Sequence, residues 1–166
     1  MPNRPAPLPI SASVDVDASP SDVWTVVSDV TRMPEFSPEL RRLFPVGGRE
    51  PRVGMRMVGI NRRGYAVWPT TSQVVRFEPG RAVAWHTRES GATWTYELEP
   101  SGTGTRLTGR RDLAAFKLGT TLLAPVIGGA AGHDRELADG IRQTLLRIKA
   151  AVESGRSVEP DPQAVR

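Results

Sequence analysis

Apolar and polar side chains alternate through residues 13–17 (Ser-Val-Asp-Val-Asp), and this period of two predicts a strand with one solvent-facing side. The residues that follow carry the signals of a helix start. Ser19 can act as the cap, Pro20 suits the first helical position, and Asp22 complements the exposed amides of the first turn. A second short helical turn is expected over residues 31–35. Two small helices are therefore predicted before the second strand.

Glycine-containing turn signals divide the middle of the chain into runs of strand length. Runs of this kind that are joined by short turns pair as antiparallel hairpins. The expected strands cover residues 40–46, 53–60, 65–77, 82–87, 92–99 and 105–113. Together with the strand at residues 13–17, they predict a seven-stranded antiparallel sheet.

One long helix, over residues 133–154, closes the pattern. Its apolar positions recur every three or four residues and therefore form one stripe, while charged residues occupy the other positions. Gly155 is a suitable stop. The stripe consists of Leu137, Ile141, Leu145, Ile148 and Val152. A sheet with one long helix laid across it is an α+β architecture, and it encloses either a filled core or a cavity.

A chain of 166 residues has the size of one domain, which we expect to cover residues 10–155. Residues 1–9 contain prolines where a signal peptide needs a continuous apolar run, so we interpret them as a flexible arm of a cytoplasmic protein. Residues 156–166 have the composition of a disordered tail.

The longest apolar stretch, residues 118–131, is interrupted by Pro125 and by Gly128-Gly129. It is too short and too broken to cross a bilayer of about 30 Å, so no stable membrane insertion is expected. Its place between the last strand and the long helix suits two interpretations. It could form the mobile edge of a cavity mouth, or the irregular beginning of the helix, kinked at the proline.

The composition argues against metal chemistry. There is no cysteine and there are two histidines, so neither a metal site nor another cofactor is expected. The net charge of +4 raises the question of whether the protein binds nucleic acid. Because the arginines are scattered singly and in pairs among acidic residues, a solvated surface is the better interpretation, and no nucleic-acid partner is expected.

Three side chains are candidates for acid–base chemistry. Tyr96 shares the inward side of its strand with Trp94, and a buried phenol needs a partner, which could be backbone, water or a ligand. Alternation also places Arg111 inward, where it would meet a ligand carboxylate or carbonyl, or else an acid such as Asp29. His86 is a candidate because imidazoles in general titrate near neutrality, but alternation sends it to the outer side unless a bulge reverses the order.

Several apolar side chains could form the wall of a cavity. Met55 and Met57 fall together on one strand, and flexible thioethers suit an adaptable wall. Trp85 and Trp94 face inward, and Trp68 lies on a long strand. Packing in the protein core is the other interpretation for each of them. The expected ligand-binding set is Met55, Met57, Trp68, Trp85, Trp94, Tyr96 and Arg111.

Five segments accompany this order of elements: ASPSDVW (18–24), SDVTRMPEFSP (28–38), GINRRG (59–64) followed by Trp68, WTYELEP (94–100) and GTRL (104–107). With these segments, the chain resembles the START-related helix-grip (SRPBCC) superfamily and, within it, the polyketide cyclase/dehydrase-like proteins. The resemblance covers roughly residues 10–154 and implies a curved sheet wrapped around the C-terminal helix, with a hydrophobic cavity between them. Such folds host carriers, cyclases, aromatases and hydrolase regulators alike.

Three functions are compatible with these observations. The leading hypothesis is a protein that binds a hydrophobic small molecule, lipid-like, polyketide-like or aromatic, in the cavity. The alternative is a polyketide cyclase/dehydratase that uses general acid–base groups there, with Tyr96, Arg111 and His86 as the candidates. The third is a regulator that docks on a partner through the apolar segment near Leu122 and Leu123. Convergent titratable groups would favour the enzyme, and apolar walls would favour the carrier.

Overall fold

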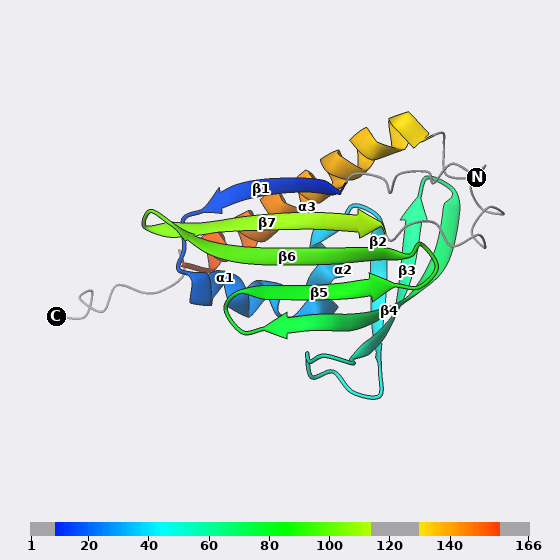
Figure 1. Cartoon of the computed structure of the whole chain (residues 1–166), viewed down its shortest axis with the longest axis horizontal. Coiled ribbons are helices and arrows are strands. Elements are labelled where there is room, and N and C mark those ends of the chain that lie inside the picture. The colour runs from blue at the N-terminus through cyan, green and yellow to red at the C-terminus, as the bar shows by residue number, and fades with distance from the viewer. Residues whose placement is uncertain (1–8, 114–129, 157–166) are drawn as a thin grey trace, which may run out of the picture.

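The computed structural model describes residues 9–113 and 130–156, which form one seven-stranded sheet and three α-helices (Figure 1). The elements in chain order are β1 (Ile10–Val16), α1 (Pro20–Val27), the 3₁₀ turn η1 (Val30–Arg32), α2 (Met33–Phe36), β2 (Leu40–Val46), β3 (Arg56–Arg63), β4 (Ala66–Glu78), β5 (Ala82–Thr87), β6 (Ala92–Ser101), β7 (Gly104–Leu113) and α3 (Ala130–Arg156).

Every pair of neighbouring strands is antiparallel, and the strand order is β1-β7-β6-β5-β4-β3-β2. The strands β1 and β2 are therefore the two edges. The sheet curves, and α3 crosses one face of it, packed on β1 and β7 and in contact with α1 and α2 (Figure 1). The predicted seven-stranded sheet, the two short helices before β2 and the long closing helix are confirmed.

One β-bulge decides which side chains of β4 reach the helix side of the sheet. The pairing of β4 with β5 shifts between Val74 and Arg76, so the alternation of sides reverses there. Phe77 consequently faces inward, as Val74 does, and packs against Trp24 with ring centroids 5.3 Å apart. Arg76 lies on the outer face, where it pairs with Glu97 at 2.7 Å.

The helix α3 buries the apolar stripe that the sequence predicts. Ile141, Leu145, Ile148 and Val152 are buried in the core between α3 and the sheet. Leu137, the first residue of the stripe, is half-buried. The stripe therefore packs most tightly along the second half of α3.

Close approach of α3 to the sheet depends on Gly109 in β7. A Cβ atom at this position would lie 3.0 Å from Cγ2 of Ile141 and 3.3 Å from Cδ2 of Leu145. A side chain would therefore push the helix away from the sheet. On the same strand face, Cε1 of Tyr96 lies 3.5 Å from that point. Gly109 thus sets the distance between α3 and the aromatic part of the inner face.

Several element boundaries differ from the expected ones. The strand β3 begins at Arg56 rather than at residue 53, because Val53 and Gly54 form a turn in which Gly54 has a φ of 91°. The strand β1 begins at Ile10 because residues 10–12 also pair with β7. The helix α3 continues past Gly155 to Arg156.

Three expectations concern segments outside the described residues. They are the flexible arm over residues 1–8, the lid or kinked segment over residues 118–129 with its Leu122 and Leu123, and the tail over residues 157–166. Residues 130 and 131 belong to α3.

The start of α1 has the expected cap. The Ser19 hydroxyl accepts a hydrogen bond from the backbone N–H of Asp22 at 3.2 Å, and Pro20 is the first helical residue. Replacing Ser19 by alanine should lower the free energy of unfolding by about 1 kcal/mol, measured by urea denaturation. Ser19→Asn keeps a capping oxygen and should stay close to the wild type; equal losses in both variants would contradict the cap.

Candidate ligand-binding site

The inner face of the sheet has two ends of different character. Near α1, the inward side chains are fully buried and apolar, as Val83 and Leu107 show. At the other end, the inward side chains are aromatic or polar and several of them are only half-buried. We call this second region the aromatic end, and it consists of Asn61, Trp68, Thr70, Ser72, Trp85, Thr87, Trp94, Tyr96 and Arg111. Such a surface beside a filled apolar core is suited to a ligand.

Three aromatic side chains form the centre of the aromatic end. Trp85 on β5 and Tyr96 on β6 are stacked, with ring centroids 5.5 Å apart and ring planes 18° from parallel. Trp94 lies directly opposite Trp85 in the register of β5 and β6. The stacked pair and the neighbouring Trp94 thus place aromatic rings on adjacent inward positions, which suits the flat face of an aromatic ligand.

Arg111 adds a positive charge to this surface. Its side chain is 9% exposed, and its guanidinium carbon lies 5.6 Å from the centroid of the Trp94 ring. The cation thus contacts an aromatic face, a favourable arrangement for arginine. Asp29, considered from the sequence as its partner, instead accepts hydrogen bonds from the backbone and hydroxyl of Thr31. A buried cation at a ligand-sized surface would favour an anionic or strongly polarised oxygen.

Tyr96 is the most deeply buried polar aromatic of the group, at 5% exposure. Its hydroxyl makes no hydrogen bond with any residue in the described ranges. Burial raises the pKa of the phenol well above its ordinary value of 10. At neutral pH the side chain is therefore a neutral phenol, able to donate a hydrogen bond to a ligand oxygen.

A row of polar side chains completes the aromatic end, and the sequence reasoning missed it. The hydroxyls of Ser72 and Thr87 are buried and lie 2.9 Å apart, and Asn61 donates to the Thr70 hydroxyl at 3.0 Å. The available signal was alternation along β4, which places Thr70 and Ser72 on the same side as Val74. These groups could orient polar substituents of a ligand.

Met57 and Trp68 lie on β3 and β4 beside this row, and Met55 lies just before β3. Met55 and Met57 are both buried in the core cluster, and Met57 pairs with Ser72 across β3 and β4. Trp68 is half-buried and lies opposite Asn61. The six members of the expected ligand-binding set that lie on strands occupy inward positions of the same sheet.

His86 does not join Tyr96 and Arg111. It lies opposite Thr93 on the outer face of the sheet, with its Nδ1 atom 3.1 Å from the Thr93 hydroxyl. No bulge reverses the alternation in β5, since Trp85 keeps its inward position. Of the three acid–base candidates, the fold brings only Tyr96 and Arg111 to one face.

Ion pairs connect the end of β3, next to the aromatic end, with α3. The Arg63 guanidinium on β3 lies 2.6 Å from a carboxylate oxygen of Glu136 on α3 and 3.2 Å from one of Glu39, just before β2. These charges are partly exposed, so each pair contributes little to stability. They fix the first half of α3 against the end of β3.

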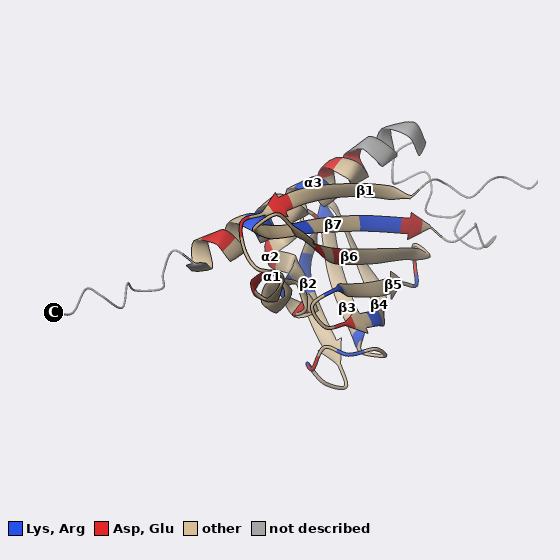
Figure 2. Cartoon of the chain, turned by 60° about the vertical axis from the view of Figure 1, so that its left-hand side comes forward, with Lys and Arg blue, Asp and Glu red and all other residues tan. Residues whose placement is uncertain are grey.

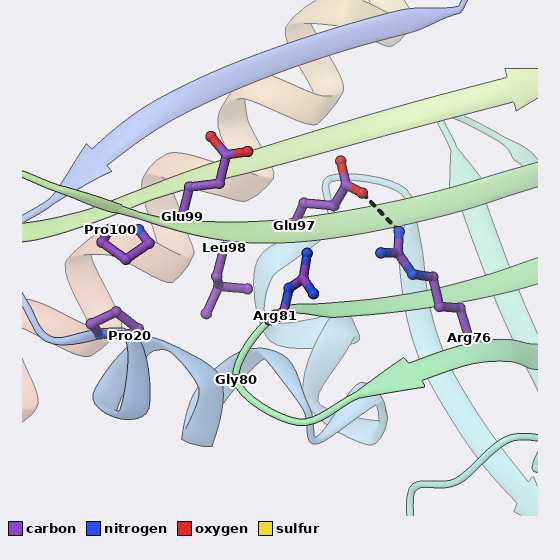
Figure 3. A pocket seen from close by; sticks show the side chains of 8 residues that line it. All are labelled: Pro20, Arg76, Gly80, Arg81, Glu97, Leu98, Glu99 and Pro100. Carbon is purple, nitrogen blue, oxygen red and sulfur yellow. Dashed lines mark hydrogen bonds and ion pairs between the residues drawn. The ribbon is translucent and has the colours of Figure 1, made fainter.

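A separate surface pocket of about 430 Å³ lies at the opposite end of the sheet, beside the start of α1 (Figure 3). Two charged groups of its lining, Arg76 and Glu97, pair with each other at 2.7 Å. Arg76 also binds Glu78 at 2.8 Å, and these contacts raise the pKa of the arginine and lower that of Glu78. Because Arg76 and Glu97 lie on the outer face, this pocket is distinct from the aromatic end.

Within residues 9–113 and 136–156, no three histidine, aspartate or glutamate side chains are grouped so that they could hold a metal ion. None of the helices in these ranges has the length and apolar character needed to cross a membrane.

Comparison with known proteins shows which family the chain matches. The family model described as polyketide cyclase/dehydrase and lipid transport matches residues 8–153. No curated protein matches the sequence.

Three solved structures have similar folds. The di-domain ARO/CYC protein StfQ of the steffimycin biosynthetic pathway has a TM-score of 0.70 at 21% identity; the match covers 90% of this chain and 52% of that one, so this chain spans about half its length. The polyketide-cyclase-like protein Cgl2372 from Corynebacterium glutamicum has a TM-score of 0.61 at 26% identity, with 95% and 98% covered. The Zhui aromatase/cyclase from Streptomyces sp. R1128 has a TM-score of 0.65 at 15% identity, with 88% and 93% covered. The helix-grip fold is confirmed.

Proposed function

We propose that this chain, which belongs to the polyketide cyclase/dehydrase and lipid transport family, binds a flat hydrophobic molecule with polar oxygens at the aromatic end of its inner sheet face. The ligand class that fits best is aromatic or polyketide-like. Its ring faces would stack on Trp85 and Trp94, and its oxygens would meet Tyr96 and Arg111. The ligand would lie between the sheet and the first half of α3.

One observation carries this proposal: the Tyr96 side chain is 5% exposed, and its hydroxyl makes no hydrogen bond with the residues that the structure describes. The phenol of a buried tyrosine usually has a hydrogen-bond partner, and a ligand oxygen would supply one here. Tyr96 stacks on Trp85 and lies one strand away from Arg111. A ligand oxygen at this place would satisfy the phenol while the rings cover the apolar part of the ligand.

Binding is supported more strongly than acid–base turnover. The raised pKa of Tyr96 makes the phenol a weak acid at neutral pH and keeps it from acting as a base. Arginine does not release its proton in proteins. The His86 imidazole lies on the other face of the sheet. Within the described part of the aromatic end, the titratable groups can therefore hold and polarise a ligand but do not shuttle protons.

Cyclisation is the second candidate function, and one feature favours it. Tyr96 and Arg111 are hydrogen-bond donors on neighbouring strands, and two donors directed at carbonyl oxygens stabilise the negative charge that develops when an enolate forms. A poly-carbonyl ligand held against Trp94 could then close a ring, with the proton taken by solvent.

Replacing Tyr96 by phenylalanine tests the proposed donor. Ligands with a ring hydroxyl or carbonyl should bind about fivefold more weakly, the value of one neutral hydrogen bond, while fused-ring hydrocarbons should bind as before. Isothermal titration with matched pairs of such compounds measures both. Tyr65, fully exposed in the β3–β4 turn, supplies the control Tyr65→Phe, which should change neither affinity.

The same pair of variants has a pH readout. In the unfolded chain Tyr96 releases its proton near pH 10, whereas the buried phenol resists, so stability falls as the pH rises above about 10. Tyr96→Phe should lessen this alkaline loss and Tyr65→Phe should not. If Tyr96→Phe bound every compound like the wild type, the phenol would be a packing residue and the proposed contact would be wrong.

A further inference from the structure

The outer, convex face of β2, β3 and β4 gathers the exposed apolar side chains of the protein. Among the described residues, seven large apolar side chains are exposed, and only Leu146 of α3 lies away from this region. The other six are Phe44, Val46, Val53, Tyr65, Val67 and Val75. They extend from the loop after β2 to the β3–β4 turn, roughly 25 Å along eight residues of strand.

The same region concentrates positive charge. Residues 40–77 contain eight arginines and one acidic residue, whereas the rest of the chain has more acidic than basic residues. Figure 2 marks the positions of lysine and arginine along the ribbon in blue. Arg42, Arg56 and Arg62 are exposed on the outer face. None of these three forms an ion pair with another residue that the structure describes. The arginines that are scattered in the sequence are thus brought together by strand pairing.

The two kinds of side chain alternate across this face. In the register of β2 and β3, Phe44 lies opposite Val58, Arg42 opposite Ile60, and Val46 opposite Arg56. Every apolar side chain on the face therefore has a cationic neighbour within one or two positions. We define the Arg/apolar face as Arg42, Phe44, Val46, Arg56, Val58, Ile60, Arg62 and Val67.

We infer that the Arg/apolar face docks the protein on the surface of an anionic lipid bilayer. A bilayer interface offers phosphates at one depth and hydrocarbon just below, so arginines and apolar side chains that alternate on one face can both be satisfied. A second copy of this chain would bring arginines against arginines. An acidic protein would satisfy the charges but would have to match a long apolar strip interrupted by arginines, whereas a bilayer needs no such match.

This face is separate from the aromatic end. Its residues point away from α3, on the opposite side of the sheet from Trp85 and Arg111. Docking therefore does not depend on the proposed ligand, and either proposal can fail without the other. Contact through the outer face would leave the inner face and α3 turned away from the lipid.

Vesicle flotation with the full chain tests the inference. The protein should float with vesicles of phosphatidylcholine that contain about 30% phosphatidylglycerol at about 0.1 M salt, and not with phosphatidylcholine alone. Arg42→Gln/Arg56→Gln should weaken partitioning roughly 25-fold, about fivefold for each arginine. The control Arg81→Gln/Arg142→Gln removes the same charge from exposed positions elsewhere and should retain binding.

A second variant separates insertion from simple charge attraction. Phe44→Ser/Val46→Ser keeps every arginine, so it should weaken partitioning while the salt dependence persists. The inference is overturned if both arginine variants lose binding equally, or if neutral vesicles bind as well as anionic ones. It is also overturned if the protein binds poly-glutamate or an oligonucleotide but not anionic vesicles.

Discussion

Replacing Arg111 by leucine is expected to weaken the binding of aromatic carboxylates by roughly 10- to 100-fold, because a hydrogen bond to a charged group contributes about 1.5–3 kcal/mol. Arg111 is 9% exposed and its guanidinium lies against Trp94, so water screens little of its attraction for an anion. The neutral amides of the same compounds should lose much less. Titration of acid and amide pairs by calorimetry gives both affinities.

Arg110 provides the matched control for this experiment. It is the next residue of β7, faces the outer side and pairs with Asp112 at 2.9 Å. Arg110→Leu removes the same charge from the chain and should leave both affinities unchanged. An apolar residue of similar size is often tolerated in place of a buried charge, so Arg111→Leu is expected to fold. Equal losses for acids and amides would show that Arg111 supports the structure rather than contacting the ligand.

The second large effect concerns stability, at the contact between α3 and the sheet. Leu145 is completely buried and lies over Gly109. Leu145→Ala should lower the free energy of unfolding by about 3 kcal/mol, within the range found for buried leucines that leave a cavity. Leu146, the next residue, is 46% exposed, and Leu146→Ala should change stability by less than about 0.5 kcal/mol. Urea denaturation of the two variants measures the difference.

This pair also tests the orientation of α3. The helix has one apolar stripe, so Leu145 within the stripe and Leu146 outside it should respond differently to the same substitution. Similar losses for Leu145→Ala and Leu146→Ala would contradict the packing of α3 on β7.

The sequence pattern predicts the sheet and α3 because both depend on patterns among residues that are close together in the sequence. Alternation along each strand identifies inward positions such as Tyr96 and Arg111, and the stripe in α3 needs only spacings of three and four residues. The bulge after Val74 is different. It exchanges the sheet faces on which Arg76 and Phe77 lie, and the alternation of residue types along β4 does not predict it. Such a reversal becomes visible only when the partner strand is in place.

The polar row and the Arg/apolar face could not be predicted from the sequence, for a related reason. Ser72 and Thr87 are 15 residues apart, and their contact depends on the register of β4 and β5. Arg42, paired with Arg41 in the sequence, and Arg56 are 14 residues apart along the chain, yet both belong to one face once β2 pairs with β3. Sites made by neighbours across strands depend on register, which single-sequence patterns specify poorly.

The central claim is that the aromatic end, and not the filled end near α1, receives the ligand. The four tryptophans give a direct test, because each indole N–H has its own signal in a nitrogen-15 correlation spectrum. Titration with fused-ring aromatic carboxylates and sulfonates should shift the signals of Trp85 and Trp94 and leave Trp24, packed on Phe77, unchanged. Signals of Trp85 and Trp94 that stay fixed at saturating concentrations of these compounds, or a shift at Trp24 alone, would contradict the account.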